Sequence, residues 1–370
     1  MLDIRFYMEC DNIFKSIQNG KLHTKEEVYA ALERIRDCDN PVVYNIETTN
    51  RCNMRCQMCP RTTMMTRPIE DIDRETFLKV VNQIHPHSHQ LWQKWKIYCE
   101  NKYGIYEEDK PSENHFFLYV IAKVIQLHGY GDPLLDKNMY EYIQILHDRG
   151  LCSYFSCNPS NINLESTYRM LDAGVDYIKY SIESTDDEEF RSIRGKASNF
   201  TSSYQDILKV LEYKQKNHLS TTIVITMLNL NRVTQKEDYE KLRRAFDGLD
   251  VYIYLKSEDC QWYRKDYHGT DSIHWSEPCK HPWMTMTIKS NGDVAMCMED
   301  FNNEIVFGNV KETSLKDIWN GERYQNFRWQ HLEGADGIKC SHQCDMLLLG
   351  DSQLYYSKKL HRCLLNEKEF

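Results

Sequence analysis

The sequence predicts an α/β fold built around a parallel sheet. From residue 42 to residue 257, extended segments rich in Val, Ile and Tyr alternate with segments of helical periodicity. The chain has 370 residues, of which 41% are apolar and 27% charged, so it is long enough for a large core. Repeated strand-helix steps of this kind form either a doubly wound sheet or a sheet curled into a barrel.

Each element follows from its own pattern. Residues 1–40 are expected to be helical, since "KEEVYAALERIRDC" spaces its apolar residues three and four apart. The predicted strands are 42–49, 124–129, 151–158, 175–184, 220–229 and 251–257. The predicted helices between them are 73–84, 136–150, 164–174, 202–217 and 237–248.

Two segments depart from this alternation. Residues 86–117 form an aromatic and charged insertion, longer than the usual connection between a helix and a strand. Beyond residue 262 the alternation ends, and "MTMTIKSNGDVAMC" predicts a hairpin that turns at Asn291–Gly292. We therefore expect a helical lead-in (1–40), an α/β domain (41–262) and a C-terminal domain (263–370).

Composition argues against several partners. The formal charge is −9 and no block of Lys and Arg forms a phosphate-binding track, so nucleic acid is not an expected partner. The N-terminal segment lacks the basic and apolar regions of a signal peptide, and no apolar run approaches about 20 residues. We expect no membrane partner and a cytoplasmic location, where the fourteen cysteines would be metal ligands, catalytic thiols or core residues rather than disulfides.

Three cysteines stand close together in "TTNRCNMRCQMCPRT", directly after the first predicted strand. Cys52, Cys56 and Cys59 have the spacing C-x3-C-x2-C, and disulfides within so short a span would be strained or leave an odd thiol. Such a loop can bring three thiolates to one iron-sulfur cluster and leave one iron open. Zinc is the competing metal, but structural zinc usually takes a second pair of ligands, and none lies nearby.

This loop resembles the signature of the radical S-adenosylmethionine (radical SAM) enzymes. The resemblance implies a partial (β/α)6 barrel, with a 4Fe-4S cluster whose open iron binds the amino and carboxylate groups of S-adenosylmethionine. Reductive cleavage of this cofactor then gives methionine and a 5'-deoxyadenosyl radical that abstracts hydrogen from the substrate. An external electron donor such as flavodoxin or ferredoxin is the implied partner.

Further positions carry the same resemblance. Met58 stands where the family places an apolar side chain near the adenine, and "GYGDP" is similar to the family's Gly-Gly-Glu-Pro segment, with Asp132 in place of Glu. "SIESTDDEEFRSIRG" resembles the family's segment at the end of the fourth strand, with Arg194 as a carboxylate partner. The implied cofactor-binding residues are Met58, Gly129, Tyr130, Gly131, Asp132, Ser156, Asn158, Ser181, Glu183 and Arg194.

The C-terminal cysteines resemble the SPASM and twitch domains, which carry auxiliary 4Fe-4S clusters. The implied ligands are Cys279, Cys297, Cys340, Cys344 and Cys363. A full SPASM domain uses seven cysteines for two clusters, so five thiolates imply one auxiliary cluster, with Cys363 able to replace another ligand. The remaining cysteines other than Cys260 are expected to be buried or incidental: Cys10, Cys38, Cys99, Cys152 and Cys157.

The end of the sixth predicted strand supplies the candidate catalytic groups. Glu258 and Asp259 are candidates for the base that deprotonates a substrate hydroxyl, and Cys260 for a hydrogen-atom donor in an epimerase. The resemblance implies oxidation or rearrangement of a polyhydroxylated small molecule, such as a sugar or aminocyclitol. The alternatives are modification of a peptide or protein, and a non-enzymatic iron-sulfur protein that transfers electrons.

Overall fold

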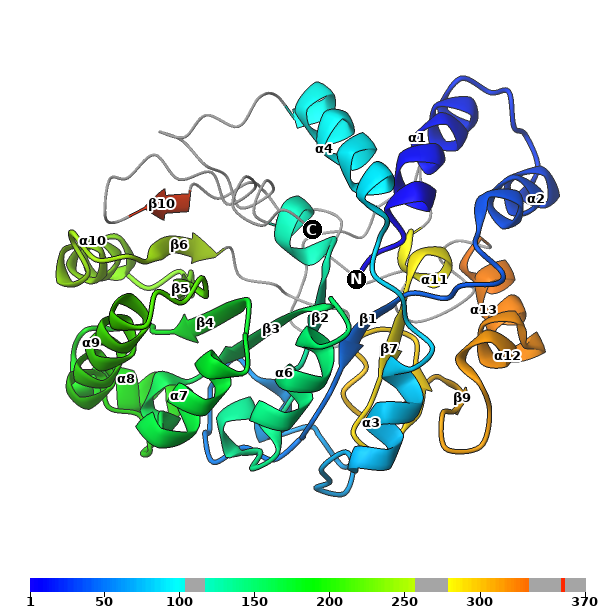
Figure 1. The fold of residues 1–370 in the computed structure, drawn as a ribbon. Helices are drawn as coiled ribbons and strands as arrows, with labels where there is room; N and C mark the ends of the chain where they lie inside the picture. The colour runs from blue at the N-terminus through cyan, green and yellow to red at the C-terminus, as the bar shows by residue number, and fades with distance from the viewer. Residues whose placement is uncertain (104–116, 257–278, 333–353, 357–370) are drawn as a thin grey trace.

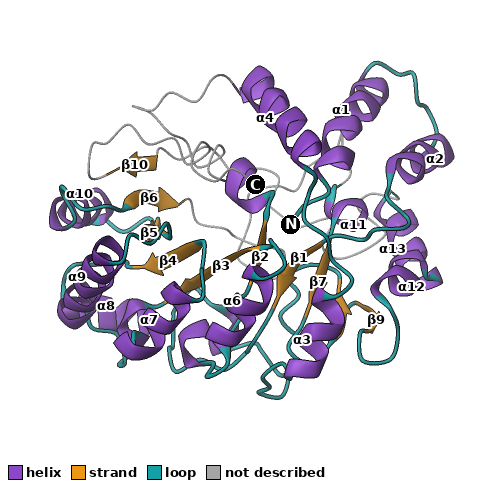
Figure 2. Cartoon of the chain, in the orientation of Figure 1, coloured by secondary structure: helices purple, strands orange, loops and turns teal. Residues whose placement is uncertain are grey.

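A computed structural model of the chain describes residues 1–103, 117–256, 279–332 and 354–356. Within them lies one sheet with the strand order β10-β6-β5-β4-β3-β2-β1-β7-β8-β9 (Figures 1 and 2). The strands are β1 (Val43–Ile46), β2 (Val124–Gln126), β3 (Cys152–Cys157), β4 (Tyr177–Ser181), β5 (Thr222–Leu228), β6 (Tyr252–Lys256), β7 (Met286–Ile288), β8 (Asp293–Ala295), β9 (Val306–Asn309) and β10 (Leu354–Tyr356).

Strands β1 to β6 lie side by side in chain order and run parallel. A doubly wound sheet would reverse its order at a switch point, so this sequential order is that of a partial barrel. The predicted α/β fold with a parallel sheet is confirmed. β7 extends the sheet on the other side of β1, also in parallel, and pairs with β8 to form the predicted hairpin.

Helices follow the strands and cover the outer face of the sheet (Figure 1). They are α3 (Arg74–Val81), α6 (Met139–His147), α7 (Leu164–Asp172), α8 (Asp187–Arg194), α9 (Phe200–Lys216) and α10 (Gln235–Ala245). Most begin at a residue whose side chain accepts a hydrogen bond from the first turn; Asp73, Asn163, Asp186 and Asn199 do so. Of these six helices, α8 alone has no counterpart among the predicted helices.

Successive side chains along each strand point to opposite faces of the sheet and so belong to two separate hydrophobic cores. Phe155 and Ile178 point outward into the main core beneath the helices. Tyr154 and Tyr177, one residue earlier, belong to a separate core with Val224 that lines the inner face. The parallel register places neighbours on the same face, so the inner positions form successive layers.

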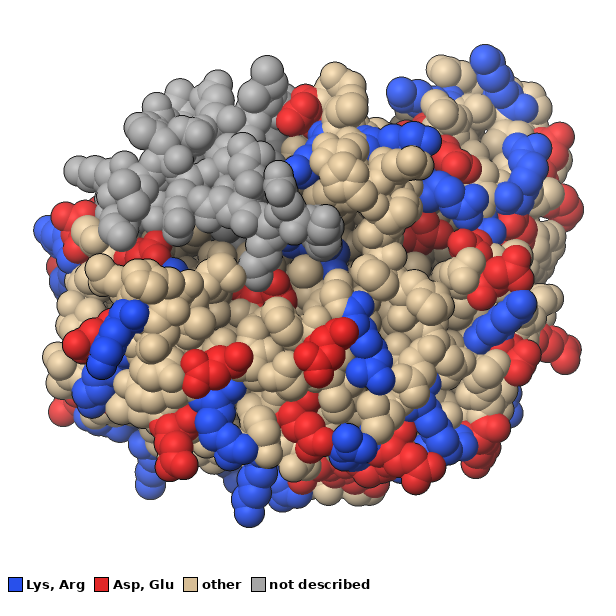
Figure 3. Space-filling model, viewed as in Figure 1, with Lys and Arg blue, Asp and Glu red and all other residues tan. Residues whose placement is uncertain are grey.

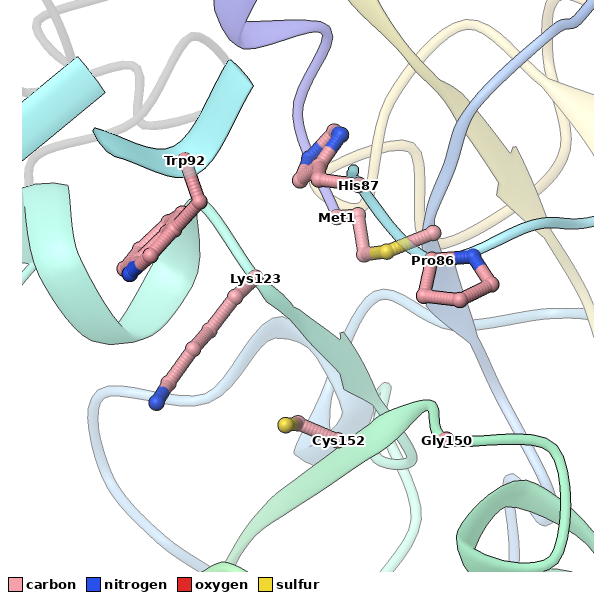
Figure 4. A pocket seen from close by; sticks show the side chains of 7 residues that line it. All are labelled: Met1, Pro86, His87, Trp92, Lys123, Gly150 and Cys152. Carbon is pink, nitrogen blue, oxygen red and sulfur yellow. The ribbon is translucent and has the colours of Figure 1, made fainter. Parts of the chain in front are cut away.

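The amino ends of the strands are packed by the start of the chain. The Met1 amino group donates to the carbonyl oxygens of Val43 and Val124, both at 2.6 Å. The cavity beside it measures only about 10 Å³ (Figure 4), and its lining residues are Met1, Pro86, His87, Trp92, Lys123, Gly150 and Cys152. That volume is at the lower limit for a single water molecule, so this cavity is too small for a substrate.

The remaining helices flank this end and the C-terminal part. They are α1 (Ile4–Gln18), α2 (Lys25–Ile35), α4 (His89–Tyr103), α11 (His281–Met284), α12 (Leu315–Asn320) and α13 (Glu322–His331). α4 lies in the insertion predicted at 86–117 and packs on α1, with Trp95 and Cys99 fully buried. The domain boundary expected near residue 263 lies outside the described residues.

Short turns occupy the carboxyl ends of the first three strands. η1 (Pro60–Thr62), η3 (Pro133–Leu135) and η4 (Pro159–Asn161) each begin with a proline, while the π-helical turn η2 (Phe117–Ile121) precedes β2. Proline suits the first position because the helix leaves that N–H without a partner.

Two further features concern the described helices and the charged side chains on the surface. Among the described helices, none is long and apolar enough to cross a membrane. On the face shown in Figure 3, acidic and basic side chains are intermixed. The described residues of this face therefore form no continuous basic track of the kind that binds phosphates.

We expect Phe77→Ala to destabilise the fold strongly. Phe77 is fully buried and stacks on Tyr142 with ring centroids 4.3 Å apart, and such a truncation typically lowers the free energy of unfolding by about 3–5 kcal/mol. Urea denaturation curves check this. Ile97→Ala is the control because Ile97 is 58% exposed; equal losses in the two variants would contradict the role assigned to Phe77.

Candidate functional site

The cysteine loop begins where β1 ends, as the sequence predicts. β1 is fully buried, and Asn50 lies at the start of the loop that follows it. The Asn50 Nδ2 donates to the Pro68 carbonyl at 2.8 Å, which holds this end of the loop in place. At the other end of the loop, the Arg61 Nε donates to the Asn50 carbonyl at 2.9 Å and so joins the two ends. The loop is therefore closed on itself around its three cysteines.

The three thiols are free and close enough to influence one another. Burial raises the pKa of Cys52 to about 11 and that of Cys59 to about 12, and the neighbouring thiols add to both shifts. Buried thiols coupled in this way become thiolates readily only beside a cation.

Within the described part of the chain, no three Cys, His, Asp or Glu side chains converge to hold a single metal ion. A loop with three cysteines is a ligand set that iron-sulfur clusters use. Cys52, Cys56 and Cys59 remain the predicted ligands of such a cluster.

The carboxyl end of β4 and helix α8 hold the middle of this loop. The Arg55 and Gln57 N–H groups donate to the carbonyls of Arg194 and Ile193, each at 2.9 Å. The Arg194 Nη1 also donates to the Cys56 sulfur at 3.7 Å. Helix α8, which was not predicted, therefore positions the central cysteine.

Arg194 already has a carboxylate partner in the protein. Its Nε and Nη2 form a two-pronged ion pair with Glu183, which is buried. Burial alone would lower the pKa of Arg194, but Glu183 and Cys56 raise it overall. The pair fixes the charge beside the loop, and Arg194 is a positioning residue as well as a candidate cofactor contact.

The predicted glycine segment packs directly against the cysteine loop. A Cβ on Gly129 would stand 2.2 Å from Glu47 Oε2, and one on Gly131 would stand 2.1 Å from the Thr49 carbonyl oxygen. The Asp132 N–H donates to the Arg51 carbonyl at 2.8 Å. Glycine is required here because any side chain would push the two segments apart.

Asp132 holds this segment from within. It is 4% exposed, and its carboxylate accepts from the N–H groups of Leu134 and Asn158, each at 3.1 Å, and from Asn161 Nδ2 at 2.8 Å. Burial raises its pKa above the ordinary value, although these donors partly offset the shift. Both oxygens are engaged, so Asp132 ties β2 to β3, and the neighbouring backbone is left to contact a cofactor.

The other predicted cofactor contacts line the same edge. The Ser156 and Ser181 hydroxyls are 3.5 Å apart, and Asn158 Nδ2 donates to the Ser198 hydroxyl at 3.2 Å. Met58 is half-buried on the cysteine loop. These side chains meet because the carboxyl ends of neighbouring parallel strands share one edge.

The sequence did not predict a role for Glu47, the charged residue at the centre of this edge. Glu47 is fully buried; its carboxylate pairs with Arg67 at 2.7 Å and accepts from the Ser290 hydroxyl at 3.1 Å and the Tyr130 N–H at 3.0 Å. Burial alone would raise the pKa of Glu47, but Lys289 and Arg67 hold it below the ordinary value. One sequence signal could have indicated it, because Glu47 is an acidic residue directly after the apolar strand β1.

The structure describes only two of the cysteines predicted to hold an auxiliary cluster. Cys279 precedes α11, and burial raises the pKa of its thiol; Cys297 follows β8 and is half-buried. The other predicted residues of this part and of the sixth strand end lie outside the described residues: Glu258, Asp259, Cys260, Cys340, Cys344 and Cys363.

Two family models match this chain. The model of the radical SAM superfamily matches residues 109–244, and the SPASM model, an iron-sulfur cluster-binding domain, matches residues 279–345. The chain thus contains a radical SAM domain. Its C-terminal part is a SPASM domain, and the two domains together imply 4Fe-4S clusters and S-adenosylmethionine as cofactors.

Two curated proteins and a solved structure are similar to this chain, over shares that differ widely. A tungsten-containing aldehyde ferredoxin oxidoreductase cofactor-modifying protein of Pyrococcus furiosus is 21% identical over 77% of this chain and 82% of its own length. An S-adenosyl-L-methionine-dependent 2-deoxy-scyllo-inosamine dehydrogenase of Niallia circulans is 36% identical, over 16% of this chain and 24% of its own. The structure of native anSMEcpe with bound AdoMet shares the fold, with a TM-score of 0.51 at 10% identity over 82% of this chain and 89% of that one.

We expect Gly131→Ala to impair the site while leaving the chain folded. The new methyl group would collide with the Thr49 backbone, and overpacking typically costs about 1–3 kcal/mol of stability. Because relief of the collision would displace the segment predicted to contact S-adenosylmethionine, we expect affinity for this cofactor to fall about tenfold. Calorimetric titration of the reconstituted protein measures this. Gly308→Ala is the control, since its Cβ would meet the flexible Ile318 side chain at 3.0 Å; similar losses in both would refute the close-packing explanation.

Proposed function

We propose that this radical SAM enzyme is an oxidoreductase that removes hydrogen from a hydroxylated small molecule. The observation that carries the proposal is the shared edge of β1 to β4, where the cysteine loop, the Gly129–Asp132 segment and the Arg194–Glu183 pair pack against one another. One bound group could contact all three. This arrangement suits a cofactor with amino, carboxylate and ribose groups.

We assign different residues of the chain to the cluster and to S-adenosylmethionine. Cys52, Cys56 and Cys59 would hold the cluster, whereas the backbone at Gly129–Asp132 and the Ser156 and Ser181 hydroxyls would contact S-adenosylmethionine. When bound, the cluster and S-adenosylmethionine would together supply the radical chemistry for abstraction of hydrogen from the substrate. The packed inner core beneath this edge would limit water access to the reacting groups.

The relatives support a small-molecule substrate. One is named for modification of a cofactor and the other for dehydrogenation of an aminocyclitol, and both names describe small molecules. A sugar or aminocyclitol is accordingly the proposed substrate class. The alternatives are a peptide substrate, which the product analysis below would reveal, and a non-enzymatic electron carrier, which would not cleave S-adenosylmethionine.

Oxidation of a carbinol also needs a base and an electron acceptor. Glu258 and Asp259 remain the proposed bases, and Cys260 remains the proposed hydrogen donor if the reaction is an epimerisation. Cys279 and Cys297, with Cys340, Cys344 and Cys363 from the remaining C-terminal segment, would hold one auxiliary cluster as acceptor. A flavodoxin or ferredoxin is the proposed external donor.

Cys56→Ala should abolish formation of 5'-deoxyadenosine, because the variant lacks the central ligand of the cysteine loop. The wild type and the variant would be reconstituted anaerobically and mixed with dithionite and S-adenosylmethionine, and the product measured by chromatography. Cys38→Ala removes an exposed thiol and serves as the control. No product from a wild type with an intact cluster would rule out the proposed function.

Cys297→Ala should separate cofactor cleavage from substrate oxidation. We expect iron to fall from about eight to about four atoms per chain as the auxiliary cluster is lost, while 5'-deoxyadenosine still forms. Iron analysis, with mass spectrometry of products from sugars, aminocyclitols and peptides, measures both effects. Unchanged iron content and unchanged substrate oxidation would show that Cys297 is no ligand.

A further inference from the structure

Residues 298–302 of the SPASM domain reach the edge of the barrel where the predicted cofactor contacts lie. The Lys289 Nζ donates to the Met298 carbonyl at 3.0 Å, and the Arg67 Nε donates to the Phe301 carbonyl at 2.7 Å. Lys289 is fully buried, and only 6% of the Arg67 side chain is exposed. Two buried cations therefore hold segment 298–302 by its backbone.

Asn302 joins the end of this segment to the chain that leaves the cysteine loop. Its Oδ1 accepts from the Thr66 N–H at 2.8 Å, and its Nδ2 donates to the Met64 carbonyl at 3.1 Å. Met64 and Thr66 lie shortly after Cys59 in the chain. Segment 298–302 is therefore fixed relative to the part of the chain that follows the cysteine loop.

Tyr130 contacts this segment from the barrel. It is the only aromatic residue of the glycine segment (residues 129–132), and its hydroxyl donates to the Glu299 carboxylate at 3.0 Å and approaches the Glu299 carbonyl oxygen at 3.3 Å. Glu299 is buried, with 7% of its surface exposed. The Tyr130 ring also packs edge-on against Phe301, with ring centroids 5.8 Å apart. The SPASM domain thus anchors a side chain of the glycine segment.

This anchor lies in the middle of the backbone that is predicted to contact S-adenosylmethionine. The Tyr130 N–H donates to the Glu47 carboxylate at 3.0 Å, which orients the peptide unit before Tyr130. The glycines on either side have no side chain to restrain their own backbone. The bond between the Tyr130 hydroxyl and the buried Glu299 carboxylate supplies a restraint of this kind, and a charged acceptor makes it stronger than a neutral one would.

We propose that Glu299 is a positioning residue for S-adenosylmethionine and acts through Tyr130. The inference rests on the proposed function, because it takes the backbone of the glycine segment as a contact of the cofactor. Glu299 holds the Tyr130 side chain and thereby the orientation of the neighbouring peptide units. The cofactor site is accordingly completed by the SPASM domain and not by the barrel alone.

Loss of the hydrogen bond between Tyr130 and Glu299 should weaken the binding of S-adenosylmethionine. The reconstituted full-length protein would be titrated with this cofactor in a calorimeter. We expect Tyr130→Phe and Glu299→Leu each to bind it about tenfold more weakly than the wild type. Glu299→Gln should stay within about threefold of the wild type, because the amide oxygen still accepts from the Tyr130 hydroxyl.

A double variant tests whether Glu299 acts through Tyr130. Tyr130→Phe combined with Glu299→Leu should bind the cofactor about tenfold more weakly than the wild type, as each single variant does, because both changes remove the same hydrogen bond. Independent effects would instead multiply to about a hundredfold loss. Iron content and urea denaturation, measured on every variant, separate a change in cofactor affinity from loss of the clusters or of the fold.

Tyr213→Phe is the matched control. The Tyr213 hydroxyl on α9 donates to the Asp172 carboxylate on α7 at 2.8 Å, so this variant removes the same kind of hydrogen bond from the outer helices. Its affinity for S-adenosylmethionine should equal that of the wild type.

Three results would overturn the proposal: wild-type affinity in Glu299→Leu, about a hundredfold loss in the double variant, or an equal loss in Tyr213→Phe. If Glu299→Leu does not fold, Tyr130→Phe decides alone, and unchanged affinity in that variant overturns the proposal. A wild type that holds its cluster but neither binds nor cleaves S-adenosylmethionine would instead refute the proposed function.

Discussion

The buried carboxylate of Glu47 is the interaction on which the site most depends. It meets Arg67 from the segment before α3, the Tyr130 N–H from the glycine segment, and Ser290 from the C-terminal hairpin. Lys289 beside it is also fully buried and donates to the Met298 carbonyl at 3.0 Å. An isolated buried charge is costly, and removal of one partner from such a group typically costs about 3–5 kcal/mol. Four segments are therefore held at one point.

A second constraint is the close approach of backbone segments. Gly129 and Gly131 leave no space beside Glu47 and Thr49, and Asp132 joins the ends of β2 and β3 through its three hydrogen bonds. The prolines that start η1, η3 and η4 turn the chain sharply after each strand. The site thus rests on rigid strand ends and short turns, which suits precise placement of a reactive cofactor.

The parts predicted from sequence are those with a local signature. The cysteine spacing, the glycine segment and the strand-helix alternation each lie within a short stretch, and the parallel topology brings their ends together without further information. Glu47 has only a weak signature, an acid directly after an apolar strand, because its partners Arg67 and Ser290 are 20 and 243 residues away in the chain. The same holds for His128, whose Nδ1 accepts from the Ser156 N–H, 28 residues away in the chain. Helix α8 was missed because its strongly acidic first turn resembles a solvated loop.

The parallel pairing of β7 with β1 links the SPASM domain to the barrel by backbone hydrogen bonds. A flexible linker would let two redox centres approach and separate, and the rate of electron exchange between them would vary with each movement. Here the loop from Cys52 to Cys59 follows β1 and Cys297 follows β8, two strands of one continuous sheet with β7 between them. The sheet therefore sets the separation of these two cysteine positions, and the proposed exchange of electrons between clusters held there would take place over a fixed distance.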